Sequence, residues 1–308
     1  LSPSDKVEYY FEVWDNDAVN GSKSTRSHVQ VIEIPSVDEI NSKTEKSNEQ
    51  IKNDISESQA DLEKMNKELE DLQQKLTEKK SLDWEEKQKV KELLEQHKNL
   101  EKQLESIVEK NKQKDQQESE FKNVDEEILE KQKQLEELFE KVVDDEMKEL
   151  MRKIEELMQQ NNKDQLNKAL EQMKMEDQEV EKQLDRMMEQ LKRLEVEKEM
   201  NDHIEKLNEL AKDQKKLADE TEKSDSKKSE DLKKKQDKLN KEFDQLKKDL
   251  DKTNKKNQDL KSPMNLDMKK PKQQEISEDQ KQSSENLQKK KNNKASQKQN
   301  DASKKMQE

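Results

Sequence analysis

The sequence predicts a mostly α-helical protein of long coiled-coil helices and helical hairpins, with a short N-terminal β-hairpin and a flexible C-terminal tail. Residues 36–262 contain neither proline nor glycine, which irregular loops normally need. Apolar residues in this stretch recur three and four positions apart, as in the seam of a coiled coil. Hydrophobic residues make up 26% of the chain and charged residues 45%, which is too polar for one large globular core.

Residues 1–35 are expected to form a β-hairpin, the end of a truncated β-sandwich module. Residues 7–14 alternate between the two faces of a strand and are rich in aromatic and β-branched side chains. Residues 28–34 form a second β-prone run that ends at Pro35. A turn-rich loop joins the two runs, so an antiparallel hairpin is the simplest structure.

The joining loop contains a weak candidate for a Ca²⁺ site. Asp15, Asp17 and Asn20 place oxygen ligands ahead of Gly21. The loop lacks a bidentate glutamate at the right distance, and Asp and Asn also bond to their own backbone in ordinary turns. An ordinary structured turn is therefore the favoured interpretation. Apart from this loop, no metal or cofactor site is expected.

Ser36 begins the helical region, because Ser36 and Glu39 fit a capping box. The seam of the first helix consists of Ile40, Ile51, Ile55, Leu62, Met65, Leu69, Leu72 and Leu76. Polar corners or apolar-poor gaps predict breaks in the coiled-coil region 36–262 near 79–82, 111–119, 161–164 and 224–229. Folding back at these breaks would give helical hairpins, and one continuous rod is the competing arrangement.

Residues 263–308 change to a composition rich in Lys, Gln, Ser and Asn. Their apolar residues form only a sparse stripe. Such a composition predicts a disordered, flexible tail with weak helical tendency.

No catalytic residues are expected, and the chain is interpreted as not an enzyme. A phosphate-binding loop needs several glycines, and Gly21 is the single glycine. The histidines His28, His97 and His203 are far apart, and no pair has the spacing of metal ligands. His97 falls on a helical seam, where packing as a polar seam residue is the favoured interpretation.

Charge and cysteine content limit the partners. The net charge of −13 argues against nucleic-acid binding, which needs a basic face. The absence of cysteine excludes disulfides and thiolate metal sites. No apolar run is long enough to span a bilayer. The chain starts at Leu1 with sequence typical of the middle of a domain, so we expect a fragment whose membrane anchor lies outside it.

Methionines give the middle of the helical region a soft apolar character. They are Met147, Met151, Met158, Met173, Met175, Met187, Met188 and Met200. Core filling is the favoured interpretation, and a surface that holds apolar client segments is the alternative.

The join between hairpin and helix carries a resemblance. Residues 9–17, residues 20–24 and the step from Pro35 to Ser36 resemble a family of large, membrane-anchored proteins of Gram-negative bacteria, as do residues 79–85 and 262–264. The family has β-sandwich-like modules, a long Gln/Glu/Lys-rich helical region and no known function. The resemblance implies a place in the cell envelope, at the periplasmic face of the inner membrane.

These observations predict a coiled-coil scaffold or interaction protein of the bacterial cell envelope. It would bind protein partners, including further copies of itself, through its apolar seams, with flanking charges setting partner and alignment. One alternative is a chaperone-like binding module that uses the methionines. Another is the coiled-coil arm of a larger protein whose active part lies outside this chain.

Overall fold

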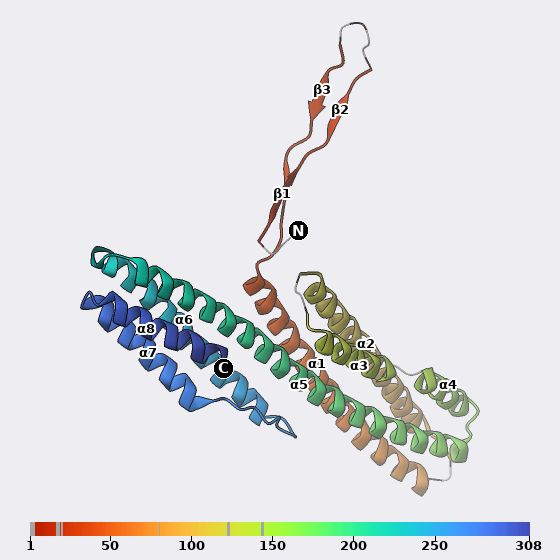
Figure 1. Ribbon diagram of the computed structural model, residues 1–308. Helices are drawn as coiled ribbons and strands as arrows, with labels where there is room; N and C mark the ends of the chain where they lie inside the picture. Colours follow the sequence, from red (N-terminus) through yellow and green to blue (C-terminus); the bar gives the residue numbers. More distant parts are fainter. Residues whose placement is uncertain (1–3, 17–18, 20, 80, 122–123, 143–144) are drawn as a thin grey trace. The chain divides into compact units, whose positions relative to one another are not determined.

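The computed structural model describes residues 4–16, 19, 21–79, 81–121, 124–142 and 145–308 (Figure 1). The chain is mostly α-helical with short antiparallel strands near its N-terminal end, which confirms the predicted class. It divides into two compact units, Leu1–Leu191 and Lys192–Glu308. Within the described residues, no helix combines the length and the apolar character needed to cross a membrane.

Four strands form a two-stranded ribbon, which we call the arm and which leads into the first helix (Figure 1). They are β1 (Lys6–Tyr9), β2 (Glu12–Trp14), β3 (Ser24–Arg26) and β4 (Gln30–Glu33). β1 pairs antiparallel with β4, and β2 pairs antiparallel with β3. Between the pairs Tyr9–Gln30 and Glu12–Arg26, one strand has one residue more than the other, so a β-bulge separates the two ladders.

The arm leaves its large apolar side chains exposed. Phe11 is 69% exposed and Trp14 is 60% exposed. The other exposed members are Tyr9, Tyr10, Val13, Val19, Val29, Val31 and Ile32. Local contacts order some of them, because the Tyr9 and Phe11 rings meet edge to face at 6.0 Å. The Arg26 guanidinium also lies 4.7 Å from the centre of the Tyr10 ring.

The first helix, α1 (Val37–Glu78), begins with a complete capping box. The Ser36 hydroxyl accepts a hydrogen bond from the Glu39 backbone N–H at 3.3 Å, and the Glu39 carboxylate accepts one from the Ser36 N–H at 2.8 Å. These bonds satisfy two backbone donors that a helix start otherwise leaves unpaired.

Replacing Ser36 with alanine is expected to destabilise the start of α1 by about 1 kcal/mol, because the cap is lost. Faster hydrogen exchange of the first-turn amides would report the loss. Ser42→Ala, an exposed position on the same helix, is the matched control and should change little. Equal exchange rates in both variants would contradict the role of the cap.

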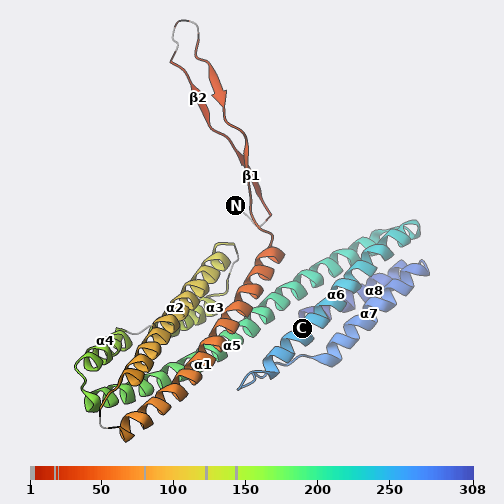
Figure 2. The same ribbon diagram turned by 180° about the vertical axis from the view of Figure 1, so that it is seen from behind.

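α1 packs antiparallel against α2 (Trp84–Phe121), as both views of the chain show (Figure 2). Three cross-helix hydrogen bonds define the alignment, Gln96 to Glu68, Gln103 to Asp61 and Lys110 to Asp54. Successive bonds are seven residues apart on each helix. The residue numbers rise along α2 as they fall along α1, as expected for antiparallel helices. The helices therefore fold back on one another, and a continuous rod is excluded for this part of the chain.

A polar corner joins α1 and α2. The Asp83 carboxylate accepts hydrogen bonds from the backbone N–H groups of Glu85 and Glu86 and so caps α2. The Lys79 ammonium bonds to both Asp83 and Glu86.

The apolar-poor gap at 111–119 lies inside α2, where the sequence predicted a break. Polar residues take the seam positions there, and Asn111, Lys114 and Glu118 are all buried. The Gln132 amide of α3 (Glu126–Val142) donates to Glu118 at 3.2 Å. Buried polar groups that are hydrogen-bonded can replace an apolar seam, and the helix continues for that reason.

Two further helices complete the first unit, α4 (Asp145–Gln159) and the N-terminal part of α5 (Lys163–Lys223). α5 runs beside α1, where the Lys174 ammonium bonds to Glu70 at 2.6 Å. The turn between α4 and α5 places Asn161 in the left-handed region, with φ +54°.

The second unit is a four-helix bundle. Its helices are the C-terminal part of α5, α6 (Ser229–Gln258), α7 (Lys270–Gln288) and α8 (Asn292–Gln307), with a short 3₁₀ turn, η1 (Ser226–Lys228), before α6. Two cross-helix hydrogen bonds for each pair of consecutive helices show that each helix runs antiparallel to the one before it. α8 then returns to α5, where the Ser296 and Ser303 hydroxyls donate to backbone carbonyls of α5.

The bundle replaces the flexible tail expected over 263–308. α7 and α8 are helices with buried faces made of Ser, Ala, Gln and Asn as well as larger apolar residues. Small side chains allow close helix packing, and their hydroxyls bond across the interface. The sparse apolar stripe forms a packed face together with these polar residues, so the prediction of a disordered tail is wrong. The turn between the two helices holds Lys290 at φ +55°.

A layer of glutamines crosses the centre of this bundle, one from each helix. Gln214, Gln236, Gln280 and Gln299 are each at most 2% exposed. Gln214 and Gln236 exchange two hydrogen bonds at 2.8 and 2.9 Å, while Gln280 donates to Gln214 and Gln299 donates to Gln236. Apolar clusters lie on either side of the layer, one around Phe243 and one around Leu232.

Candidate functional site

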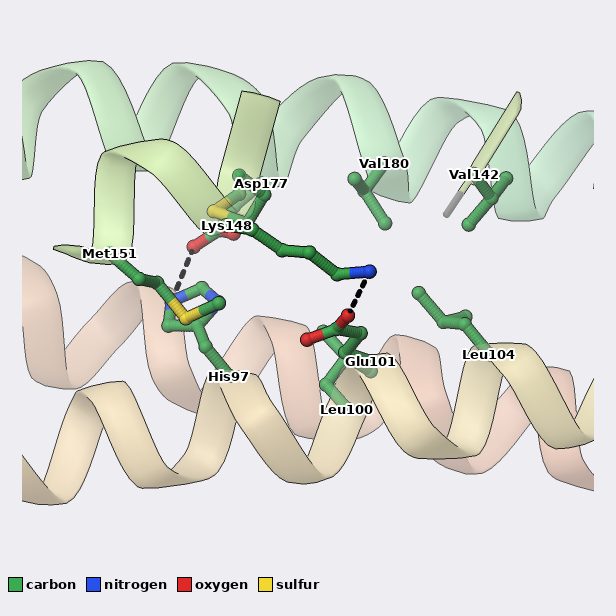
Figure 3. A pocket seen from close by; sticks show the side chains of 10 residues that line it. His97, Leu100, Glu101, Leu104, Val142, Lys148, Met151, Asp177 and Val180 are labelled. Atoms are coloured by element: carbon green, nitrogen blue, oxygen red, sulfur yellow. Dashed lines mark ion pairs between the residues drawn. The ribbon is translucent and has the colours of Figure 1, made fainter. Parts of the chain in front are cut away.

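The first unit contains a cavity of about 40 Å³ between α2, α4 and α5 (Figure 3). Most of its lining is apolar, and it is lined by His97, Leu100, Glu101, Leu104, Val142, Met147, Lys148, Met151, Asp177 and Val180. Helical periodicity explains the set, because residues three and four apart share one face of a helix. A water molecule needs roughly 10–15 Å³ of such volume, so the cavity can hold a small occupant.

Two buried ionisable groups face each other at this cavity. His97 Nε2 lies 3.5 Å from Asp177 Oδ2, and both side chains are at most 2% exposed. This distance is too long for a hydrogen bond. His97 Nε2 and both carboxyl oxygens of Asp177 make no hydrogen bond in the part of the chain that is described. Such orphaned groups are rare in protein interiors and point to an occupant or a switch.

Burial moves the pKa values of the two groups in opposite directions. It lowers the pKa of His97 to about 4, and together with a smaller effect of the Glu176 charge it raises the pKa of Asp177 to about 7. The short separation alone would suggest an ion pair. Desolvation outweighs that attraction here, because a 3.5 Å contact without a hydrogen bond does not compensate two buried charges. We therefore assign the pair one proton, held by Asp177 at mildly acidic pH.

The other charges at the cavity neutralise each other. The Lys148 ammonium and the Glu101 carboxylate form an ion pair at 2.8 Å, which Figure 3 shows beside the His97–Asp177 contact. Asp177 is thus the group whose charge the cavity does not balance. Seam packing was predicted for His97, and it does lie buried in the seam. Asp177 was not singled out, because nothing in the sequence relates it to His97, 80 positions earlier.

The methionines divide between core and surface. Met151, Met158, Met173 and Met187 are buried, whereas Met175 is 67% exposed. The remaining three, Met147, Met188 and Met200, are half-buried. This distribution favours core filling for the buried members. Met147 and Met151, one helical turn apart, line the cavity.

The candidate Ca²⁺ loop is described only in part, because Asp17 and Asn20 lie outside the described residues. Asp15 Oδ1 accepts a hydrogen bond from the Lys23 N–H at 2.9 Å, and the Asp15 carbonyl accepts one from the Ser22 hydroxyl. Asp15 thus has the contacts of an ordinary turn residue. Gly21 has φ +86°, a conformation that favours glycine.

A second buried histidine lies in the bundle of the second unit. His203 Nε2 is 2.9 Å from the Thr253 hydroxyl, which in turn lies 2.7 Å from Glu199. A catalytic triad needs an acidic group on the other ring nitrogen of the histidine, and His203 Nδ1 has no hydrogen-bond partner among the described residues. The arrangement fits a structural hydrogen-bond chain. His28, the remaining histidine, is exposed on the arm.

The fold and the cavity define a mostly helical protein with a β arm and a buried polar pair. No family model, no curated protein and no solved structure matches the chain. The resemblance of residues 9–17 and the following segments to the Gram-negative family stays a prediction.

Proposed function

We propose that the chain is a non-enzymatic scaffold or interaction protein of the cell envelope. Its helices associate with one another to form the body, and its arm makes contact with a second copy of the chain. The observation that carries the proposal is the contrast between helix and arm. The seam residues of α1 and α2 are buried within the chain, whereas the arm keeps aromatic residues such as Phe11 and Trp14 largely exposed. The envelope location is supported by the family resemblance alone.

The arm has the properties of a strand-pairing element. A two-stranded ribbon is marginally stable alone and gains stability from additional strands. Both of its edges offer backbone N–H and C=O groups to another strand. Large exposed apolar surfaces on soluble proteins mark interaction sites. Pairing of two arms would bury these side chains and complete the backbone hydrogen bonds of one edge.

The strand 6–14 is complementary to itself in one antiparallel alignment. If Tyr9 lies opposite Tyr9 of a second copy, Val7 lies opposite Phe11, and Lys6 lies opposite Glu12. Two of these pairs are favourable cross-strand contacts, one between apolar residues and one between opposite charges, while Glu8 lies opposite Tyr10. The β-bulge leaves this edge regular, because its extra residue lies in the other strand.

A cysteine at Tyr9 tests the alignment, because the chain has no other cysteine. We expect Tyr9→Cys to form a disulfide-linked dimer on mild oxidation, since opposite residues of antiparallel strands bring their Cβ atoms close enough for a disulfide. Non-reducing gel electrophoresis and mass spectrometry would detect the dimer.

Trp84→Cys is the control for random collision. Trp84 is 79% exposed and lies on α2, away from the strands. We expect it to crosslink much more slowly than Tyr9→Cys. If both variants crosslink at the same rate, or if the unmodified chain sediments as a monomer at every concentration, self-association through the arm is wrong.

A further inference from the structure

We infer that the cavity between α2, α4 and α5 is a binding site for a soft monovalent metal ion, Cu(I) or Ag(I). The ligands would be the His97 imidazole, the Met147 and Met151 thioethers, and the Asp177 carboxylate. The inference is independent of the scaffold role proposed above, since it concerns the interior of the first unit.

The donor atoms converge on one small space. Met147, Met151, His97 and Asp177 all line the same cavity of about 40 Å³. In Figure 3 the Met151 side chain and the Asp177 carboxyl group extend toward the His97 ring from different helices. Three separate helices thus supply the ligands, so the folded unit holds them in place before any ion arrives.

The spacing of the two orphaned groups suits a shared ion. In a tetrahedral site with nitrogen and oxygen ligands about 2.1 Å from the metal, the distance typical of zinc, two ligand atoms lie about 3.4 Å apart. His97 Nε2 and Asp177 Oδ2 are 3.5 Å apart. Neither atom has a hydrogen-bond partner within the described residues, so an ion would supply the interaction that each lacks.

The donor chemistry selects a soft ion. Thioether ligands favour Cu(I), and imidazole binds copper and zinc alike. Hard divalent ions prefer several oxygen ligands. No group of three His, Cys, Asp or Glu residues that could hold a metal ion occurs in the part of the chain that the structure describes. Methionine is therefore needed to complete the ligand set.

The charge balance selects a monovalent ion. Glu101 and Lys148 cancel each other at the cavity, at 2.8 Å, which leaves the single carboxylate of Asp177. One positive charge on one carboxylate gives a neutral centre. A divalent ion would leave one net charge buried among apolar side chains, which is costly. The same balance keeps the Lys148 ammonium from repelling the bound ion.

Silver ion, supplied as a nitrate salt in chloride-free buffer, tests the site without redox chemistry. We expect one tight site per chain by calorimetry, a higher melting temperature of the folded chain, and no comparable binding of Zn²⁺. The double substitution Met147→Leu/Met151→Leu should weaken silver binding at least about tenfold. Leucine conserves the volume of methionine, so this variant should keep its helical circular dichroism.

Met158→Leu is the matched control, because Met158 is buried on the same helix but does not line the cavity. We expect it to bind silver as the unmodified chain does. Three results would overturn the inference: no tight silver site, a site that survives the double substitution, or equally tight binding of Zn²⁺. Loss of binding in both variants would equally overturn it, since the site would then not be this cavity.

Discussion

Replacing Gln236 with alanine is expected to destabilise the four-helix bundle by about 3 to 5 kcal/mol. The Gln236 amide carbonyl accepts hydrogen bonds from Gln214 and Gln299, and its N–H group donates to Gln214. Removing the side chain would leave these partners buried with fewer hydrogen bonds and would open a cavity. The effect exceeds that of an ordinary surface change because the position is fully buried.

Hydrogen exchange measured along α6, α7 and α8 would detect this loss, since two units need not unfold in a single step. Gln245→Ala, an exposed glutamine on α6, is the matched control and should change stability by less than about 0.5 kcal/mol. Equal effects of the two substitutions would show that the glutamine layer does not hold the bundle together.

Replacing all four glutamines of the layer with leucine should have a different outcome from the single substitution. The four side chains would lose their hydrogen bonds to one another together, and the buried Ser283 hydroxyl would still lose its acceptor, so the bundle should lose less stability than with the single substitution. The hydrogen bonds that fix the relative height of the helices would be lost. We expect broader side-chain NMR signals and a less unique arrangement of the helices.

Replacing Asp177 with asparagine is expected to make the first unit sensitive to acid. Burial, rather than Asp177, lowers the pKa of His97 to about 4 from an ordinary value of 6.5. Between these pH values the unfolded chain binds a proton that the folded chain does not. Stability should therefore fall as pH falls from 6.5 to 4, by on the order of 3 kcal/mol in total.

Replacing His97 with glutamine is expected to give the opposite slope. Burial, and secondarily Glu176, raises the pKa of Asp177 to about 7 from an ordinary value of 3.8. The folded chain then binds a proton that the unfolded chain releases. The stabilising contribution is complete below pH 3.8 and is lost as pH rises through 7. The nearby ion pair of Glu101 and Lys148 is present in both variants.

In the unmodified chain, the pH dependences of stability that arise from His97 and Asp177 should cancel. Between pH 4 and 6.5 the folded pair holds one proton, on Asp177, and the unfolded chain also holds one, on His97. The two contributions cancel, and the pair should add little pH dependence in this window. Urea unfolding of all three proteins across pH 4 to 8 measures the slopes. Parallel slopes in the two variants would contradict the assignment of the proton.

Much of the first unit could be predicted from the sequence because its seams are apolar. Ile51, Ile55 and Leu62 recur at helical spacing, and all three are completely buried in α1. Capping follows local rules, so Ser36 and Glu39 were also recognised. These signals depend on residues that are near each other in the sequence, where helical geometry alone decides which side chains share a face.

The second unit was harder to predict because its core is partly polar. Gln280, Ser283 and Gln299 look solvated when each is considered alone. They are buried because side chains from two other helices, α5 and α6, satisfy their hydrogen bonds, which no local pattern reveals. The cavity has the same cause, since positions 97, 147, 151 and 177, far apart in the sequence, all line it. Tertiary packing, not helical periodicity, brings together residues that are so far apart in the sequence.

The near absence of glycine has a mechanical consequence for the turns. Asn161 and Lys290 occupy left-handed conformations, which asparagine adopts readily but which cost lysine roughly 1–2 kcal/mol. The packed helices therefore hold Lys290 in a backbone conformation that lysine disfavours. Backbone hydrogen bonds from Lys290 to Leu287 and from Lys291 to Asn286 close this turn onto the end of α7. The packing of α7 against α8 therefore has to offset the cost of the Lys290 turn that joins them.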